Sequence, residues 1–312
     1  MYLKPSENIQ LFGMNIFFNE IANLYNQKKM PNKILLSGKK GLGKSTLAYH
    51  IINYILSLDE DYKYDINKFT IHNENKSYKL LQNHSHPNFY LVDLLDDKKN
   101  IDVAQVREMI KYTNKSSFND MPRFILIDNI ENLNKNSVNA LLKIIEEPNH
   151  GVFFILINNN EKKILPTLRS RCLTFKINLT FKNTTSIINQ LLKKNIFEIC
   201  NNDLIHYYIT PGEIINLVNI ADEKKINLLE HNLKSLLNLL IDGAYYKKNK
   251  LVKSVIINFI ELIFLKEYRF GGQKSSLISF YHYFMDKINN TEKFNLDDES
   301  LFLEFKSKLL NG

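Results

Sequence analysis

Short apolar runs alternate with helical patterns in the first half of the chain. The apolar runs lie at residues 33–37, 89–92, 124–127 and 152–157. Apolar residues recur at helical spacing over residues 45–56, 103–112 and 136–147. The run at 124–127 is apolar at every position, as a strand buried on both faces of a parallel sheet should be. This alternation predicts an α/β core in which helices connect parallel strands.

Helical periodicity dominates from about residue 178 to the end of the chain, where no alternating strand pattern occurs. The predicted helices lie at residues 186–193, 214–220, 228–244, 251–268 and 296–310, with a turn at Thr210-Pro211-Gly212 and a break at Gly271-Gly272. We therefore expect three domains. They are an α/β core over residues 1–177, a small helical lid over 178–225 and an all-α domain over 226–312.

The bulk properties fit a globular protein, since 44% of the 312 residues are hydrophobic and 24% are charged. No apolar run approaches the ~18–20 residues needed to cross a bilayer. The first residues lack the basic and then apolar pattern of a signal peptide. We expect a soluble, cytoplasmic protein without a membrane partner.

Charge and cysteine content narrow the chemistry only a little. The net charge of +8 is compatible with a nucleic-acid partner, but the abundance of lysine along the whole chain also explains it. Cys172 and Cys200 are the only cysteines, so the sequence predicts neither a disulfide framework nor a cysteine zinc site. We expect His72, His84 and His86 to be loop residues and expect no zinc.

The segment Gly38–Ser45 matches the phosphate-binding pattern G-x-x-x-x-G-K-[ST] at every fixed position. It follows a predicted strand and precedes a predicted helix, so backbone N–H groups and the helix N-terminus can converge on phosphate oxygens. Lys44 is expected to reach the terminal phosphates and Ser45 to bind Mg²⁺. The residues expected to contact ATP or ADP here are Gly38, Gly41, Leu42, Gly43, Lys44, Ser45 and Thr46.

The other expected Mg²⁺ ligand is an aspartate at the end of a second predicted strand. Asp128 follows the apolar run at 124–127, and Asn129 follows Asp128. An active ATPase of this type usually carries a carboxylate at the second position, because an amide cannot accept a proton from the attacking water. Glu131 lies three residues beyond Asp128 and is not expected to substitute. We therefore predict that the chain binds nucleotide with Mg²⁺ and hydrolyses it weakly or not at all.

Two longer segments carry a family resemblance. Residues 139–148 read Asn-Ala-Leu-Leu-Lys-Ile-Ile-Glu-Glu-Pro, and residues 165–172 read Leu-Pro-Thr-Leu-Arg-Ser-Arg-Cys. Together with the phosphate loop, they resemble the clamp-loader branch of the AAA+ family, and within it the delta-prime subunits of bacterial DNA polymerase III. The resemblance is strong over about residues 31–176 and thinner beyond. It implies an AAA+ core, a helical lid and an all-α collar domain that joins other subunits.

The resemblance also implies roles for single residues. Arg171 would stabilise ATP bound on a neighbouring subunit, with Arg169 as a weaker candidate; the alternative is that Arg171 only pairs with a carboxylate of its own chain. One asparagine of residues 158–160, with Asn158 our choice, would sense nucleotide. Glu213 stands about where family members carry a sensing arginine, which argues against tight binding of a γ-phosphate. The four-cysteine zinc module of many members is missing from residues 57–85.

The expected function is that of a non-motor, stator-like subunit of the polymerase holoenzyme. Its expected partners are gamma/tau-like and delta-like clamp-loader subunits, the sliding clamp and primed DNA, contacted through the phosphate backbone. The alternative is a gamma-like ATPase motor of the same complex, which Asn129 disfavours. A kinase with the same loop is a third class, but it would leave residues 165–172 unexplained.

Overall fold

The computed structural model describes residues 4–95, 98–115, 119–270, 274–294 and 296–310. The strands are β1 (Lys33–Ser37), β2 (Phe89–Val92), β3 (Arg123–Ile127), β4 (Val152–Asn158) and β5 (Leu173–Lys176). The helices are α1 (Asn15–Asn26), α2 (Lys44–Leu56), α3 (Lys76–Gln82), α4 (Val103–Thr113), α5 (Lys135–Glu146), α6 (Pro166–Arg169), α7 (Phe181–Leu192), α8 (Pro211–Lys224), α9 (Leu233–Asp242), α10 (Lys250–Phe270), α11 (Lys274–Phe294) and α12 (Asp298–Phe305).

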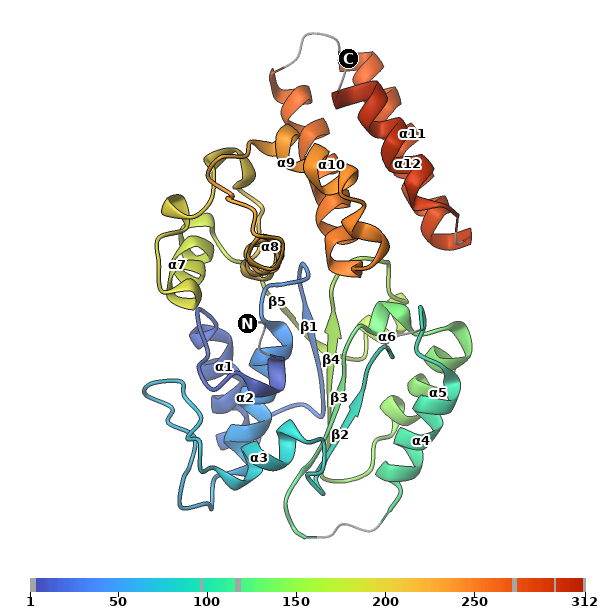
Figure 1. The fold of residues 1–312 in the computed structure, drawn as a ribbon. Helices are drawn as coiled ribbons and strands as arrows, with labels where there is room; N and C mark the ends of the chain where they lie inside the picture. The colour runs from blue at the N-terminus through green and yellow to red at the C-terminus, as the bar shows by residue number, and fades with distance from the viewer. Residues whose placement is uncertain (1–3, 96–97, 116–118, 271–273, 295, 311–312) are drawn as a thin grey trace. The chain divides into compact units, whose positions relative to one another are not determined.

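The five strands form one parallel sheet in the order β2-β3-β4-β1-β5. Alternate residues of each strand pack on opposite faces. Leu36 packs with the helices α1, α2 and α3, while Leu35 packs with α4 and α5, and Figure 1 shows these two helical layers on either side of the sheet. The predicted α/β core with a parallel sheet is confirmed. The strand order reverses beside β1, which is where ligands bind in such sheets.

The sequence patterns missed one strand and several helices. β5 has only four residues, and of these only Phe175 is buried, so its pattern did not stand out. It pairs in parallel with β1 and forms one edge of the sheet. The helices α1, α3 and α11 were also missed. The predicted helix at 228–244 is shorter in the structure, because Asn232 caps α9 by accepting a hydrogen bond from the N–H of Ser235.

The chain forms two compact units. The first contains residues 1–187 with 210–212, and the second contains residues 188–209 with 213–312. The second unit has its own core, in which the rings of Phe264, Phe284 and Phe305 pack edge to face or tilted against one another. Tyr281 packs edge to face against Phe264 and is 39% exposed. The three-domain division stays a prediction, and the predicted break at Gly271-Gly272 lies outside the described residues.

Hydrogen bonds hold the segment at residues 57–85, where many family members would carry a zinc module. The Glu60 carboxylate accepts from the backbone N–H groups of Lys76 and Ser77 at 2.8 and 2.9 Å, and from the Ser77 hydroxyl at 2.6 Å. Asn75 caps α3 and accepts from Asn53 Nδ2 at 2.8 Å. These bonds fix the start of α3 against α2.

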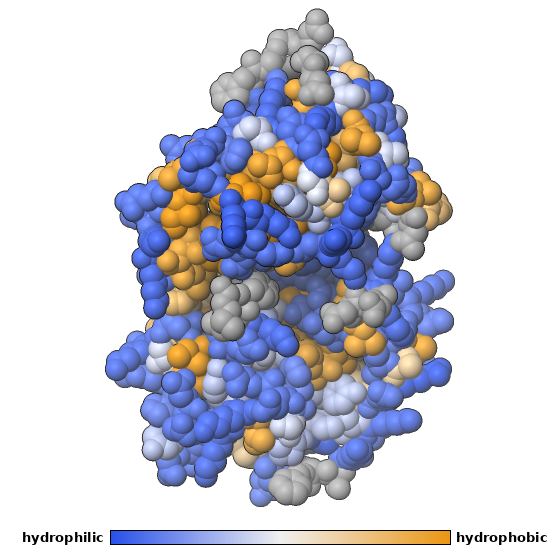
Figure 2. All heavy atoms as spheres, in the orientation of Figure 1, coloured by the Kyte–Doolittle hydropathy of each residue, from blue (hydrophilic) through white to orange (hydrophobic). Residues whose placement is uncertain are grey.

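Within the described part of the chain, no three His, Cys, Asp or Glu side chains gather as a metal-binding group. None of the helices found there combines the length and the apolar character needed to cross a membrane. Hydrophilic residues cover most of the face drawn in Figure 2, with smaller groups of apolar residues between them.

Candidate nucleotide-binding site

The phosphate loop lies at the carboxyl end of β1, directly before α2. Gly41 and Gly43 have φ angles of 82° and 91°, in the left-handed region that favours glycine. These turns bring the chain from the strand to the start of α2 within six residues, 38–43. The N-terminus of α2 therefore borders the loop, as an anion site requires.

Two glycines pack backbone against backbone around the loop. A side chain at Gly38 would place its Cβ 2.3 Å from the carbonyl oxygen of Ile177. Gly212 donates its backbone N–H to the carbonyl oxygen of Gly41 at 2.9 Å, and a Cβ there would lie 2.6 Å from Gly41 Cα. The turn predicted at 210–212 is instead the start of α8, which begins at Pro211, and its Gly212 contacts the phosphate loop directly.

Lys44 is 3% exposed and bends back onto its own loop. Its ammonium donates to the carbonyl oxygens of Gly38 at 2.8 Å and Lys39 at 2.7 Å. Burial lowers the pKa of Lys44 to about 8, although the nearby Asp128 and Glu131 carboxylates oppose this shift. Phosphate oxygens would offer this desolvated cation stronger partners than two carbonyls.

Ser45 and Asp128, the two predicted Mg²⁺ ligands, contact each other, and their role in binding Mg²⁺ stays a prediction. The Ser45 hydroxyl donates to Asp128 Oδ2 at 2.5 Å, and Asp128 Oδ1 accepts from the backbone N–H of Asn129 at 2.7 Å. Burial, and then the charge of Asp93, raises the pKa of Asp128 to about 6. A hydroxyl and a carboxylate are oxygen ligands that suit Mg²⁺, which keeps several waters of its own. A cation bound here would also stabilise the charged form of the buried Asp128 carboxylate.

Asn129 connects the ends of three strands. Its Nδ2 donates to Asp93 Oδ1 at 2.7 Å, beyond the end of β2, and its Oδ1 accepts from Asn159 Nδ2 at 2.8 Å, beyond the end of β4. The backbone N–H of Asn159 donates to both carboxylate oxygens of Glu131, at 3.2 and 3.3 Å. Asn159 is one of the three candidate asparagines at 158–160, whereas Asp93 was not predicted as a site residue. Both follow predicted strands, and the carboxyl ends of these strands meet here.

Asn158, the asparagine chosen from the sequence, turns toward β1. Its Nδ2 donates to Asn160 Oδ1 at 2.8 Å and, more weakly, to Ser37 Oγ at 3.4 Å. Its carbonyl oxygen accepts from the backbone N–H of Gly38 at 3.2 Å. Asn158 therefore borders the start of the phosphate loop, whereas Asn159 joins the cluster around Asp128. The sensing role of Asn158 stays a prediction.

The remaining predicted residues are Leu42 and Thr46, in and next to the loop, and Glu213, in the second unit. Leu42 is buried and Thr46 is half-buried in the first turn of α2. Glu213 belongs to the second unit, where its Oε1 accepts from Asn258 Nδ2 at 3.2 Å. Its predicted effect on the γ-phosphate stays a prediction.

Arg171 and the phosphate loop lie at opposite ends of the strands. It precedes the amino end of β5, whereas Gly38 follows the carboxyl end of β1, and Leu173 pairs with Ile34. At ~3.3 Å per strand residue, the two positions are about 15–20 Å apart along the strands. The exposed Arg171 guanidinium pairs with Glu146 Oε1 at 2.7 Å and donates to the carbonyl oxygen of Thr167 at 2.8 Å.

Comparison with known proteins identifies the family. The family model for the DNA polymerase III, delta subunit matches residues 13–180. The chain is 28% identical over 289 residues to the DNA polymerase III subunit delta' of Buchnera aphidicola subsp. Schizaphis graminum (strain Sg), which covers 88% of this chain and 83% of that protein. It is 31% identical over 193 residues to the subunit gamma of the same organism, which covers 61% of this chain.

The chain spans only 50% of the length of that gamma relative. A solved gamma subunit-related protein of Thermotoga maritima is 14% identical, with a TM-score of 0.45 over 92% of this chain and 97% of that one; at this score the overlay adds no argument. The match of the family model covers more than half of the chain. The chain therefore belongs to the clamp-loader family of DNA polymerase III subunits, within the AAA+ proteins and close to delta-prime.

Proposed function

We propose that the chain is a non-motor, delta-prime-like subunit of a clamp loader, which binds ATP or ADP and lends Arg171 to nucleotide on a neighbouring subunit. The proposal rests on the positions of Arg171 and the phosphate loop, which lie at opposite ends of the neighbouring strands β5 and β1. An arginine about 15–20 Å from its own loop cannot contact nucleotide held there. A phosphate bound by Arg171 would therefore be held by a second subunit.

The loop geometry supports nucleotide binding by this chain. Lys44, Ser45 and Asp128 lie together at the carboxyl edge of the sheet, with the N-terminus of α2 beside them. Bound nucleotide with Mg²⁺ would supply a polarising cation and phosphate oxygens. The residues of the chain would bind and orient the phosphates and hold them at the helix N-terminus.

The same cluster supports weak hydrolysis. The residue after Asp128 is an amide, and an amide cannot accept the proton of an attacking water. Glu131 is the next carboxylate along the chain, but both of its oxygens accept from the backbone N–H of Asn159. Glu131 thereby holds the end of β4 and is not positioned as a general base.

The surroundings of Arg171 support a role between subunits. The Arg171 and Glu146 side chains are 36% and 50% exposed, and such an exposed ion pair contributes only ~0–1 kcal/mol. A planar guanidinium can exchange a weakly held carboxylate for phosphate oxygens. The intrachain pair is therefore compatible with transfer to a neighbour's nucleotide.

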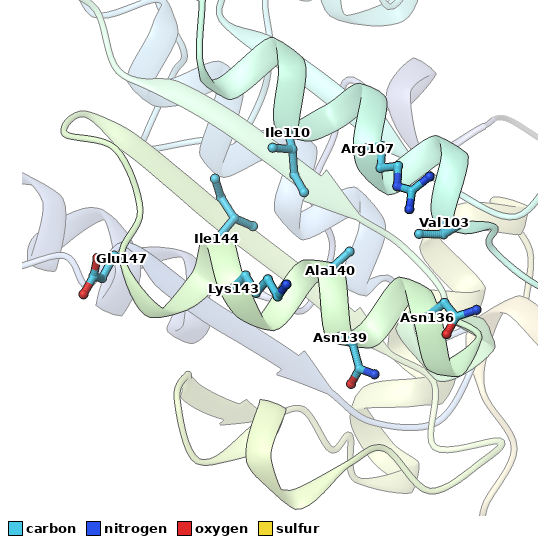
Figure 3. A pocket seen from close by; sticks show the side chains of 9 residues that line it. All are labelled: Val103, Arg107, Ile110, Asn136, Asn139, Ala140, Lys143, Ile144 and Glu147. Atoms are coloured by element: carbon cyan, nitrogen blue, oxygen red, sulfur yellow. The ribbon is translucent and has the colours of Figure 1, made fainter.

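A groove between α4 and α5 supports contact with the DNA backbone. Its volume is about 580 Å³, and its lining residues are Val103, Arg107, Ile110, Asn136, Asn139, Ala140, Lys143, Ile144 and Glu147. Figure 3 shows Ile110 and Ile144 facing each other in the groove, with Arg107 toward the start of α4, Lys143 in the last turn of α5 and Glu147 beyond it. Arg107 and Lys143 are cations that can bind phosphates without reading sequence.

The proposal is tested by the substitution Arg171→Ala in the reconstituted complex with partner subunits, clamp and primed DNA. We expect ATP hydrolysis by the complex to fall by about 10³-fold, as when an arginine finger is lost. The isolated variant should keep its unfolding midpoint and its affinity for ADP. Arg169→Ala is the matched comparison and should leave hydrolysis by the complex unchanged. An unchanged rate with Arg171→Ala would sink the assignment.

The alternative is a gamma-like motor, favoured by the intact phosphate loop and by the similarity to a gamma subunit. A motor would hydrolyse ATP as the purified chain, stimulated by clamp and DNA, and Lys44→Ala would abolish that turnover. The proposed non-motor subunit predicts little turnover before and after this substitution.

A further inference from the structure

The side chain of Asn129 has a fixed orientation in the polar cluster. An amide has one donor end and one acceptor end. The donor end faces the Asp93 carboxylate at 2.7 Å, and the acceptor end faces the Asn159 amide at 2.8 Å. A carboxylate has acceptors and no donor, so Asp93 determines which end of Asn129 faces β2.

The backbone at position 129 also favours a short polar side chain. Asn129 has φ 54° and ψ 44°, in the left-handed region. Asparagine and aspartate adopt this region far more readily than glutamate and other longer residues. A carboxylate introduced here with least strain is therefore that of aspartate, which has the same shape as asparagine.

Asp93 is placed opposite Asp128 by the strand register. Val92 pairs with Ile127, and the backbone N–H of Asp128 donates to the carbonyl oxygen of Val92 at 2.9 Å. Asp93 Oδ1 also accepts from the backbone N–H of Leu94 at 2.6 Å. The half-buried carboxylate thus stands one strand away from the position where an active ATPase would carry it.

We propose that Asp93 is a positioning residue that forms one carboxylate–amide pair with Asn129, and that the order of this pair keeps the site from hydrolysing nucleotide. The proposal rests on the proposed function, namely that the loop at Gly38–Ser45 binds ATP or ADP. With the carboxylate beyond β2 and the amide beyond β3, nucleotide is retained. With the order reversed, a carboxylate would follow Asp128 directly.

The hydrogen bonds predict that the carboxylate and the amide can change places, but that carboxylates cannot occupy both positions. The single substitution Asn129→Asp sets two carboxylates against each other at the distance of the present hydrogen bond, without a proton between them. The exchange Asp93→Asn with Asn129→Asp keeps a donor opposite an acceptor. It also keeps an acceptor for Asn159. The oxygen of Asp93 that faces Asn129 also accepts from the N–H of Leu94, so an amide nitrogen in its place loses that one bond.

The first experiment measures thermal unfolding of the full chain without nucleotide. We expect Asn129→Asp to lower Tm by about 2–4 °C, and the exchange variant to recover at least about half of that loss, because it regains the bond across the pair but not the bond to Leu94. Asp93→Asn should change Tm by less than about 1 °C, because its Oδ1 can still accept from Asn129. The exposed Asp61→Asn is the control for loss of one negative charge. If Asp93→Asn does not rescue Asn129→Asp, the pairing is wrong.

The second experiment measures ADP binding and ATP hydrolysis by the same proteins with Mg²⁺. In hydrolysis the water oxygen bonds to the terminal phosphorus, the bond to the bridging oxygen of ADP breaks, and the water proton passes to the carboxylate. We expect the exchange variant to hydrolyse ATP at least about tenfold faster than wild type, and Asn129→Asp alone to show no gain.

An equal gain with the single substitution, or no gain with the exchange, would overturn the inference about hydrolysis. Failure of wild type and all variants to bind ADP would instead overturn the proposed function. The Tm rescue is measured without nucleotide, so it would still decide whether Asp93 and Asn129 act as one pair.

Discussion

The charged groups at the two ends of the strands differ in burial. At the carboxyl ends (the carboxyl edge) they are buried and hydrogen-bonded to one another. At the amino ends (the amino edge) Arg171 is exposed and forms an exposed ion pair. Lys44 is 3% exposed and bonds two carbonyls, and Asp128 bonds Ser45. Arg171 contacts Glu146 and the carbonyl of Thr167. The two edges belong to the same compact unit but differ in how firmly their charges are fixed.

This difference separates two ways of using a charge. A buried cluster fixes its geometry before a ligand arrives, at the cost of desolvating its charges. An exposed arginine gives up little when it leaves its carboxylate, so a partner can recruit it. The first arrangement suits a site that the chain serves alone, and the second suits a site completed by another subunit.

The largest expected effect in the isolated chain is at Lys44. Lys44→Ala removes the cation that would bind the phosphates, and we expect the affinity for ADP to fall about a hundredfold. Lys40→Ala is the matched control, because Lys40 is exposed and pairs with Glu161 at 3.1 Å. Titration with a fluorescent ADP measures both. Equal losses for the two variants would remove the distinction between the buried cluster and its surroundings.

A smaller effect is expected from the pH dependence of Asp128. Burial and the charge of Asp93 raise the pKa of Asp128 to about 6 in the folded chain. The stability that protonated Asp128 contributes is therefore fully present below the pKa of Asp128 in the unfolded chain, and it is lost as the pH rises through 6. Asp128→Asn removes this loss. Relative to wild type, the variant should gain about 1 kcal/mol more stability at pH 8 than at pH 5.

Urea unfolding without nucleotide at the two pH values measures this difference. Asp61→Asn, at an exposed carboxylate, should show none. A pH-independent difference between Asp128→Asn and wild type would mean that the Asp128 carboxylate is not held in an unfavourable buried position.

The smallest effect is expected at the amino edge. Glu146→Gln removes the partner of Arg171, and we expect the free energy of unfolding to change by less than about 0.5 kcal/mol, because the pair is exposed. Hydrolysis by the assembled complex should stay within about twofold of wild type. A large loss in either measurement would show that Glu146 fixes Arg171 as firmly as the buried cluster fixes Lys44.

Local sequence determined the phosphate loop, so the loop could be predicted. The spacing from Gly38 to Ser45 specifies the turn chemistry, and the apolar strand before Asp128 places that carboxylate at the same edge of the sheet. The family resemblance suggested a role for Arg171 on a neighbour. Its distance from its own loop could not be predicted, because it depends on β5, a short edge strand without a clear pattern.

The hydrogen bonds of Asn129 could not be predicted either. They depend on the left-handed backbone at Asn129 and on the register that brings Asp93 beside Asp128. The choice between Asn158 and Asn159 has the same origin. Asn158 ends β4 and bonds Ser37 and Asn160, whereas Asn159 follows the strand and bonds Asn129. Strand alternation predicts the face of the sheet on which a side chain lies, but not these partners. No property of the two identical side chains distinguishes them.

The contact between Gly212 and Gly41 has a mechanical consequence. The chain passes between its two compact units at three points, after residues 187, 209 and 212. Residues 210–212 belong with the phosphate loop, and Pro211 and Gly212 begin α8. The Gly212 N–H is one of the first N–H groups of this helix, which have no partner within the helix, and Gly41 supplies its acceptor. A phosphate that displaced Gly41 would therefore leave the first turn of α8 without this bond.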